Sequence, residues 1–143
     1  MLDLLLPKDK LSRCIFIAWF ILAVMALATS GVYSFLPYAL RTPFLAQYMN
    51  LKHLFNVSLM VHVNLGVLIW FMSCSAMLMI IVTKESYMLI SLVAFLSSVI
   101  GAIFIATSPF IGEAEAIKSD YIPILHSLTF IIGISLFVTG VLL

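Results

Sequence analysis

The residue with the clearest capacity for chemistry is His62, which lies within a nearly uninterrupted apolar run over residues 54–82. A polar ring nitrogen at bilayer depth is costly unless it has a partner, so an intramembrane histidine is a candidate functional site. Gly66 follows four residues later on the same helical face and leaves a bare patch of backbone there. A large flat ligand could lie against that patch, which makes His62 a candidate ligand of a haem iron.

Two other roles suit the same position. Ser58, Gly66 and Ser73 share roughly the side of the helix that carries His62. Stripes of small and polar residues form ordinary helix–helix contacts in membranes, where a histidine hydrogen-bonds to a neighbouring helix. An intramembrane histidine can also relay protons. Spacing alone favours packing, and it leaves iron ligation and proton transfer open.

The other polar candidates in the apolar runs are weaker. His53 lies at the entry of the same run, where an interfacial residue is expected. If the helices alternate across the bilayer, His126 lies within about one turn of the depth of His62, so a haem held by both histidines is conceivable. Asn64 points away from His62 and is a candidate for hydrogen bonding between helices.

Four apolar stretches would position these residues, over 15–38, 54–82, 87–111 and 121–143. Each reaches the roughly 20 residues that a helix needs to cross about 30 Å of hydrocarbon. Of the 143 residues, 64% are hydrophobic and 9% are charged, far from the composition of a soluble globular domain. The sequence therefore predicts an all-α integral membrane protein, with four transmembrane helices in a single domain over residues 1–143.

Charge and cysteine content exclude several classes of function. The formal net charge is +1 and no basic patch is present, so the expected partner is the lipid bilayer and not a nucleic acid. Cys14 and Cys74 lack C-x-x-C spacing, so we interpret both as small buried hydrophobic side chains without a metal or redox role. The sequence has no glycine-rich phosphate loop and no pair of carboxylates within a predicted span.

The distribution of basic residues predicts the orientation of the chain. An N-terminus in the cytoplasm places four basic residues inside and three outside, and the first loop usually dominates, so both termini are expected inside. The segment 41–52 is then interfacial, and the acidic segment 113–120 is a solvated connection on the outside. The last span stops at Leu143 without a polar flank, which is typical of a truncated chain.

Two segments carry a resemblance to a known family. Residues 41–73, RTPFLAQYMNLKHLFNVSLMVHVNLGVLIWFMS, resemble the region of the first two helices in haem–copper oxidase subunit I. The likeness is to a bacterial subunit I-like branch with an RTP element before a VHV-x-L-x-x-L-x-W-F run. Residues 119–130, SDYIPILHSLTF, are similar to the entry of its fourth helix. In that family the second-helix histidine is an axial ligand of the low-spin haem, and by position this residue is His62.

The resemblance covers the first four of about twelve family helices, and the remaining haem and copper ligands lie on later helices. It implies an N-terminal fragment or split subunit of a terminal oxidase-like subunit I in the bacterial inner membrane. Such a chain would supply His62 to a low-spin haem in respiratory electron transfer, completed by the remaining helices or other oxidase subunits, and would not be catalytic alone. No family ligand is expected at His126. The alternatives are a small non-enzymatic tetraspan assembly protein and a bis-histidine b-type cytochrome.

Overall fold

The computed structural model describes residues 7, 9–42, 51–82, 87–111, 115–117 and 124–143, without the side chains of residues 40, 51–53 and 115–117. Three helices in it are long and apolar enough to cross a membrane: Lys10–Ala39, Leu54–Val82 and Met88–Phe110. These helices match the first three predicted spans closely. The all-α prediction is confirmed, with a short two-stranded ladder added to it.

Helix α1 (Lys10–Leu40) is a single helix of 31 residues. At its start the Asp9 side chain accepts a hydrogen bond of 2.7 Å from the backbone N–H of Ser12, a common N-cap arrangement. The side-chain and backbone hydrogen bonds with Ser12 hold the pKa of Asp9 below its ordinary value. Farther along, the helix continues through Gly31 and Pro37, two residue types with low helix propensity.

The second long helix has a wider turn in its middle. It consists of α3 (Leu51–Val63), the π-helix η2 (Asn64–Ile69) and α4 (Trp70–Val82). Apart from Ser58, its fully buried residues recur every four positions, at Val57, Val61, Leu65, Ile69 and Ser73. In a regular α-helix that spacing drifts about 40° per step, so five positions could not share one face. The π turn, with its i→i+5 bonds, reduces this drift.

The fourth span was predicted over residues 121–143, and its predicted start is wrong. The helix there, α6 (Leu128–Leu142), has 15 residues, or about 22 Å, which is less than the thickness of the hydrocarbon core. Residues before it form β2 (Ile124–His126), which pairs antiparallel with β1 (Glu115–Ile117). This pairing places the backbone of Ile124–His126 in an extended ladder, and a fourth complete span is not confirmed.

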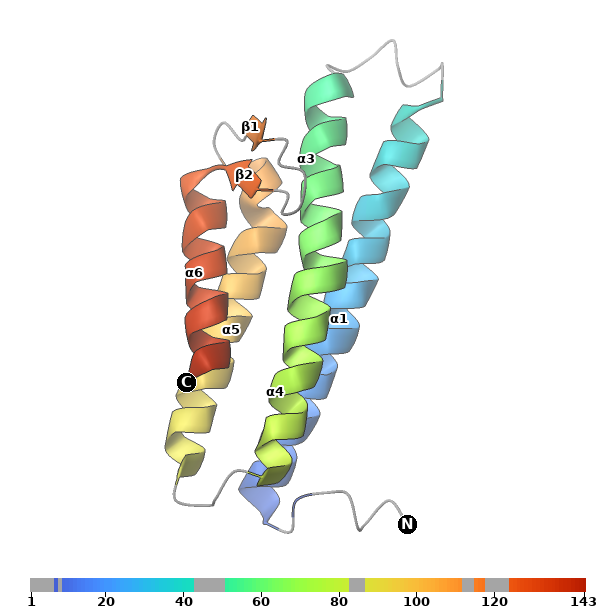
Figure 1. The fold of residues 1–143 in the computed structure, drawn as a ribbon. Coiled ribbons are helices and arrows are strands. Elements are labelled where there is room, and N and C mark those ends of the chain that lie inside the picture. The colour runs from blue at the N-terminus through green and yellow to red at the C-terminus, as the bar shows by residue number, and fades with distance from the viewer. Residues whose placement is uncertain (1–6, 8, 43–50, 83–86, 112–114, 118–123) are drawn as a thin grey trace.

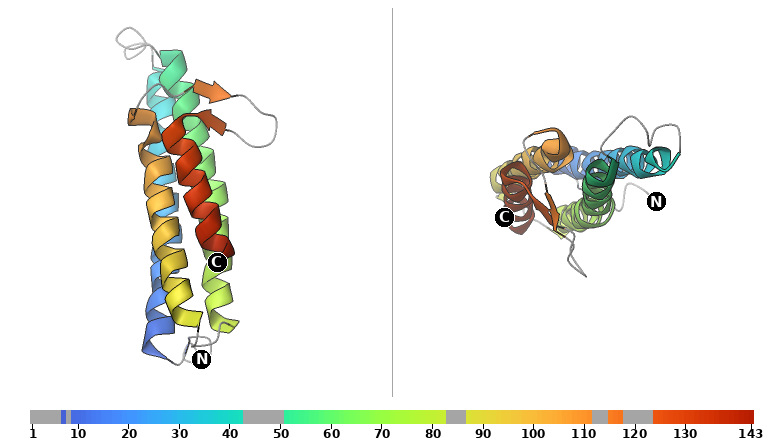
Figure 2. Two further views of the ribbon diagram at one scale, coloured as in Figure 1. Left: turned by 90° about the vertical axis from the view of Figure 1, so that its left-hand side faces the viewer. Right: turned by 90° about the horizontal axis from the view of Figure 1, so that it is seen from above.

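The helices alternate in direction and pack as two close pairs (Figures 1 and 2). One pair is α1 with the helix over residues 51–82, and the other is α5 (Met88–Thr107) with α6. The 3-10 turn η4 (Ser108–Phe110) extends α5 toward the ladder. A large apolar core joins the two pairs, with Val61, Leu65, Ile105, Phe130 and Phe137 fully buried.

Large apolar side chains also cover the outside of the bundle. Val32, Leu89 and Leu142 are examples, with exposed fractions of 64%, 76% and 78%. An outward apolar surface on three long helices indicates a lipid bilayer as the environment. Cys14 lies on this exposed surface and Cys74 is partly exposed, so the prediction that both are buried is wrong for Cys14.

Several predictions made for the loops fall mainly outside the described residues. They concern the interfacial segment 41–52, the acidic segment 113–120 and the orientation that the loop lysines favour. Within the second of these, the backbone of Glu115–Ile117 is described and forms β1. The expectation of a plain solvated connection therefore missed a strand at this position.

Candidate functional site

His62, in the last turn of α3, is joined to a neighbouring helix through its side chain. It is partly buried and faces Ser30 of α1, which is 3% exposed. The Nδ1 atom of His62 lies 2.8 Å from the carbonyl oxygen of Ser30 and 2.8 Å from its hydroxyl oxygen. The Ser30 hydroxyl donates a further hydrogen bond of 2.8 Å to the carbonyl oxygen of His62. The sequence prediction of a hydrogen bond from this histidine to a neighbouring helix is confirmed.

These contacts determine which ring nitrogen carries the proton in the neutral imidazole. A carbonyl oxygen only accepts hydrogen bonds, so Nδ1 must be the donor to Ser30. The single hydroxyl proton of Ser30 is already donated to His62, so the hydroxyl oxygen also accepts from Nδ1. The lone pair therefore lies on Nε2, which has no hydrogen-bond partner among the described residues. Histidines that ligate metals usually have this arrangement, in which the other ring nitrogen donates to a carbonyl.

Gly66 has a different role from the one expected. A Cβ atom at this position would lie 2.6 Å from the hydroxyl oxygen of Ser30, so α1 occupies the bare patch of backbone. No flat ligand can rest there. The prediction that Gly66 makes room for a porphyrin is therefore wrong, and its physical role is close approach of two helices, as is usual for small residues in membranes.

The rest of the predicted stripe is buried. Ser58 and Ser73 are 1% and 0% exposed, and neither hydroxyl has a hydrogen-bond partner within the described part of the chain. Asn64 is also buried, and its side-chain amide donates a hydrogen bond of 2.9 Å to the carbonyl oxygen of Met60 in its own helix. This bond stabilises the turn that precedes the π-helix. π turns occur often beside functional residues, and the sequence analysis did not anticipate this one, because residues 54–82 are apolar at nearly every position.

The structure does not join the other histidines to His62. His126 is exposed at the end of β2, where its backbone pairs with Glu115, so it is outside the helix in which it was expected. No hydrogen bond between the side chains of His62 and His126 is found in the described residues. His53 lies in the first turn of α3, and its side chain is outside the described residues.

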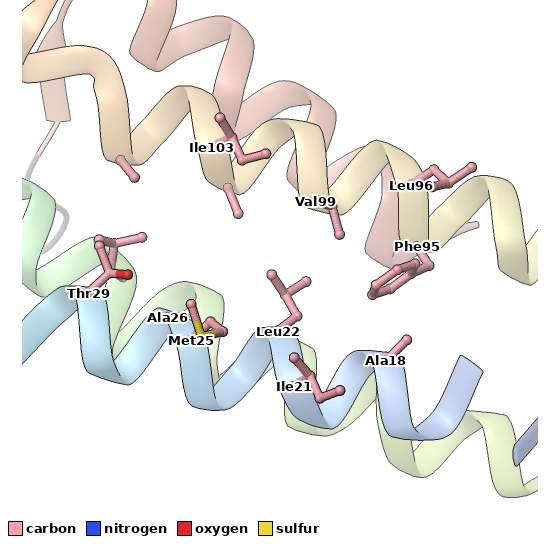
Figure 3. Close-up of a pocket in the computed structure, with 13 residues that line it drawn as sticks. Ala18, Ile21, Leu22, Met25, Ala26, Thr29, Phe95, Leu96, Val99 and Ile103 are labelled. Carbon is pink, nitrogen blue, oxygen red and sulfur yellow. The ribbon is translucent and has the colours of Figure 1, made fainter. Parts of the chain in front are cut away.

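A cavity of about 410 Å³ lies elsewhere, between α1 and α5. Figure 3 shows Leu22 of α1 and Phe95 of α5 pointing into it from opposite helices. Its lining is apolar except for Thr29, and it includes Leu65 but not His62. The Trp19–Phe95 contact, with ring centres 5.4 Å apart, lies at the end nearer the N-terminus of α1. This cavity lacks groups for acid–base or ligand chemistry, so His62 is the better candidate site.

The bonding of the His62 ring is compatible with a role as one axial ligand of a haem. The ring is oriented by two contacts from Nδ1, and Nε2 retains its lone pair. Among the described residues no group of three His, Cys, Asp or Glu side chains could hold a metal ion. A haem iron needs no such group, because the macrocycle supplies four nitrogens and the protein supplies only axial ligands.

Comparisons with known proteins identify two similar bacterial chains. The chain is 29% identical to an uncharacterized protein of Rickettsia prowazekii (strain Madrid E) over an alignment 150 positions long, which covers 88% of this chain and 29% of the relative. It is also 29% identical to an uncharacterized protein of Aquifex aeolicus (strain VF5) over 127 residues, 87% of this chain and 31% of the relative. No protein-family model and no solved structure matches. The chain thus spans less than a third of the length of the relatives it matches.

Proposed function

We propose that this chain supplies His62 as one axial ligand of a low-spin haem in a membrane protein resembling haem–copper oxidase subunit I. The observation that carries the proposal is the hydrogen bond from Nδ1 to the Ser30 carbonyl, which leaves the Nε2 lone pair for iron. The sequence resemblance over residues 41–73 supports the same residue. A low-spin haem with two axial ligands takes up and releases single electrons, which suits respiratory electron transfer.

In this proposal the chain holds one half of the haem site. The second axial ligand comes from helices beyond the four present here, either the remainder of a subunit I-like protein or another oxidase subunit. The relatives support this arrangement because each is about three times as long as the segment it shares with this chain. Both relatives are bacterial, which supports the bacterial inner membrane as the location. The chain's own role is binding and orientation, so we expect no oxygen reduction by this chain alone.

A reduced-minus-oxidised absorbance spectrum of the detergent-purified chain tests the assignment. The protein is loaded with haem in the presence of imidazole, which can supply a second axial nitrogen, and gel filtration removes unbound haem and its imidazole complex before the spectrum is recorded. We expect a low-spin band in the wild type, its loss in His62→Ala, and its retention in the matched control His126→Ala. The absence of any haem band in the wild type would contradict the proposal. Equal loss in both variants would favour the bis-histidine cytochrome.

One observation favours a second candidate, a non-enzymatic membrane assembly protein. Ser30, His62 and Gly66 all contribute to close packing of α1 against the second long helix, and they do so without a ligand. In that case His62→Ala would destabilise the bundle although no haem is bound. A thermal unfolding measurement on haem-free protein, made beside the spectra, separates the two roles.

A further inference from the structure

The apolar cavity between α1 and α5 is a slot that runs along both helices (Figure 3). It extends from Ala18 to Thr29 on α1 and from Phe95 to Ala106 on α5. On each helix the two ends are eleven positions apart, or about 16 Å. Both helices are long and apolar enough to cross a membrane, so the slot runs in the direction of the acyl chains of a bilayer.

The slot is deep and narrow. Ala26 and Ala102 form its buried floor, whereas Met25 and Ile103 on its rim are large and exposed. A helix with its side chains is about 10 to 12 Å wide, so these rims hold it away from the floor. The close helix contacts elsewhere in the bundle are made at glycines such as Gly101, and the described lining of the slot contains no glycine. This shape suits a thin flexible chain better than a further helix.

The size and the surroundings of the slot point to the same occupant. An apolar cavity of about 150 Å³ holds one benzene molecule, so the 410 Å³ of the slot accommodate roughly 16 carbon atoms. An apolar space does not retain water, and an empty one deprives its lining of contacts. The exposed rim makes the slot continuous with the outer apolar surface of the bundle, which faces lipid.

We propose that the slot binds one acyl chain of a membrane phospholipid, with the methyl end of the chain at the centre of the bundle. Ala18 lies about 12 Å from the start of α1 at Lys10, and Thr29 lies about 16 Å from its end at Leu40. Headgroups lie near the ends of the helix, so only the far half of a chain reaches this depth. The chain fills the gap between the two helix pairs and holds them together. The slot does not include His62, so this site is independent of haem binding.

Photocrosslinking in a bilayer tests the proposal. The full chain is reconstituted in vesicles of palmitoyl-oleoyl phosphatidylcholine that contain a trace of the same lipid with a diazirine near the methyl end of one chain. After illumination, mass spectrometry of peptides locates the adducts. In the wild type we expect adducts at Ala26 and Ala102, which are buried from bulk lipid, and at the exposed Ile100.

Two substitutions of the same kind on α5 separate the slot from bulk lipid. Val99 points into the slot, so Val99→Phe fills it and should abolish the adducts at Ala26 and Ala102 while leaving those at Ile100. Val93 is exposed and does not line the slot, so Val93→Phe is the matched control and should label like the wild type. Ala18→Leu repeats the test from the α1 side with a smaller change. Thermal unfolding shows that each variant is folded.

Four outcomes would overturn the proposal. Wild-type adducts at exposed positions alone would show that the chain stays outside the slot. Adducts at Ala26 and Ala102 that persist in both filled variants would show that lipid reaches them by another route. Crosslinks between two copies through α1 and α5, without adducts at these alanines, would show that a second copy covers the slot. If a low molar fraction of an isoprenoid quinone removes the adducts at the alanines but not at Ile100, the slot holds an isoprenoid tail and the phospholipid assignment fails.

Discussion

At the scale of single residues, His62 shows how a membrane helix accommodates a polar ring. Its Nδ1 proton goes to a backbone carbonyl of the neighbouring helix, and the Ser30 hydroxyl returns a hydrogen bond to the carbonyl of His62. Interhelical hydrogen bonds of this kind contribute about 0.6 to 2 kcal/mol in membranes. They also require close approach of the helices, which Gly66 permits.

A double-mutant cycle tests this coupling. Gly66→Ala places a Cβ 2.6 Å from the Ser30 hydroxyl oxygen, and moving that hydroxyl breaks its bond to His62, so we expect a loss of about 1 to 2 kcal/mol of stability. In a Ser30→Ala background the nearest remaining atom is the Ser30 Cβ at 3.5 Å, an ordinary contact, so the same change should cost less. Thermal unfolding in detergent measures both, with Gly31→Ala as the neutral control because nothing lies within 4 Å of its Cβ. Additive effects of the two substitutions would argue against the contact.

At the scale of elements, the pair α5–α6 is joined through backbone contacts. A Cβ at Gly101 would lie 2.5 Å from the backbone nitrogen of Phe137, and one at Gly140 would lie 2.5 Å from the carbonyl oxygen of Ala94. Ser97 donates to the carbonyl oxygen of Leu136 at 2.9 Å, and Ser98 donates to that of Phe137 at 3.3 Å. Small residues let the helices meet along α6, which compensates for the short length of that helix.

We expect Gly101→Ala to destabilise the α5–α6 pair more than Gly66→Ala destabilises the pair of α1 with the helix over residues 51–82. The atoms that a Cβ would meet at Gly101 belong to the backbone of α6 and cannot rotate away, so α6 has to move as a whole, at a cost of about 2 to 3 kcal/mol. A disulfide crosslink engineered between α5 and α6 reports the effect directly, since its rate of formation should fall. An unchanged rate, together with unchanged thermal unfolding, would show that the helices are not in such close contact.

At the scale of the whole molecule, successive helices run in opposite directions. Helix α6 therefore runs toward the end of the bundle where α1 begins (Figure 1). Helix α6 has only 15 residues, so it reaches part of the way along the bundle (Figure 2). A short apolar helix is accommodated by local thinning of the bilayer or by neighbouring helices, at modest cost. That both termini lie on the same side of the membrane stays a prediction.

Reporter fusions test this arrangement. Green fluorescent protein joined to residue 143 should fluoresce in bacterial cells as strongly as the same protein joined to residue 1, because both ends are expected in the cytoplasm. Alkaline phosphatase inserted between residues 113 and 120 should be active, because that segment is expected outside. Phosphatase activity at residue 143 in place of fluorescence would show that α6 does not complete a fourth crossing.

Much of the site could be read from residue types alone. A histidine in an apolar run had to have a partner, and the sequence correctly anticipated a hydrogen bond to another helix. It could not identify Ser30 as that partner, because 32 positions separate the two residues and helix pairing depends on packing across the whole bundle. For the same reason Gly66 was assigned to a ligand when α1 occupies its face.

Sequence by itself determined the membrane class, three of the spans and the identity of the candidate ligand, because hydropathy and residue chemistry are local properties. Only the tertiary structure decided that Nε2 carries the lone pair, that a π turn follows His62, and that residues 124–126 pair with β1 instead of joining α6. Each of these depends on hydrogen bonds whose partners are chosen when the helices come together. The protonated nitrogen of a histidine is determined by its neighbours in space, and in this bundle the decisive neighbour is the carbonyl oxygen of Ser30.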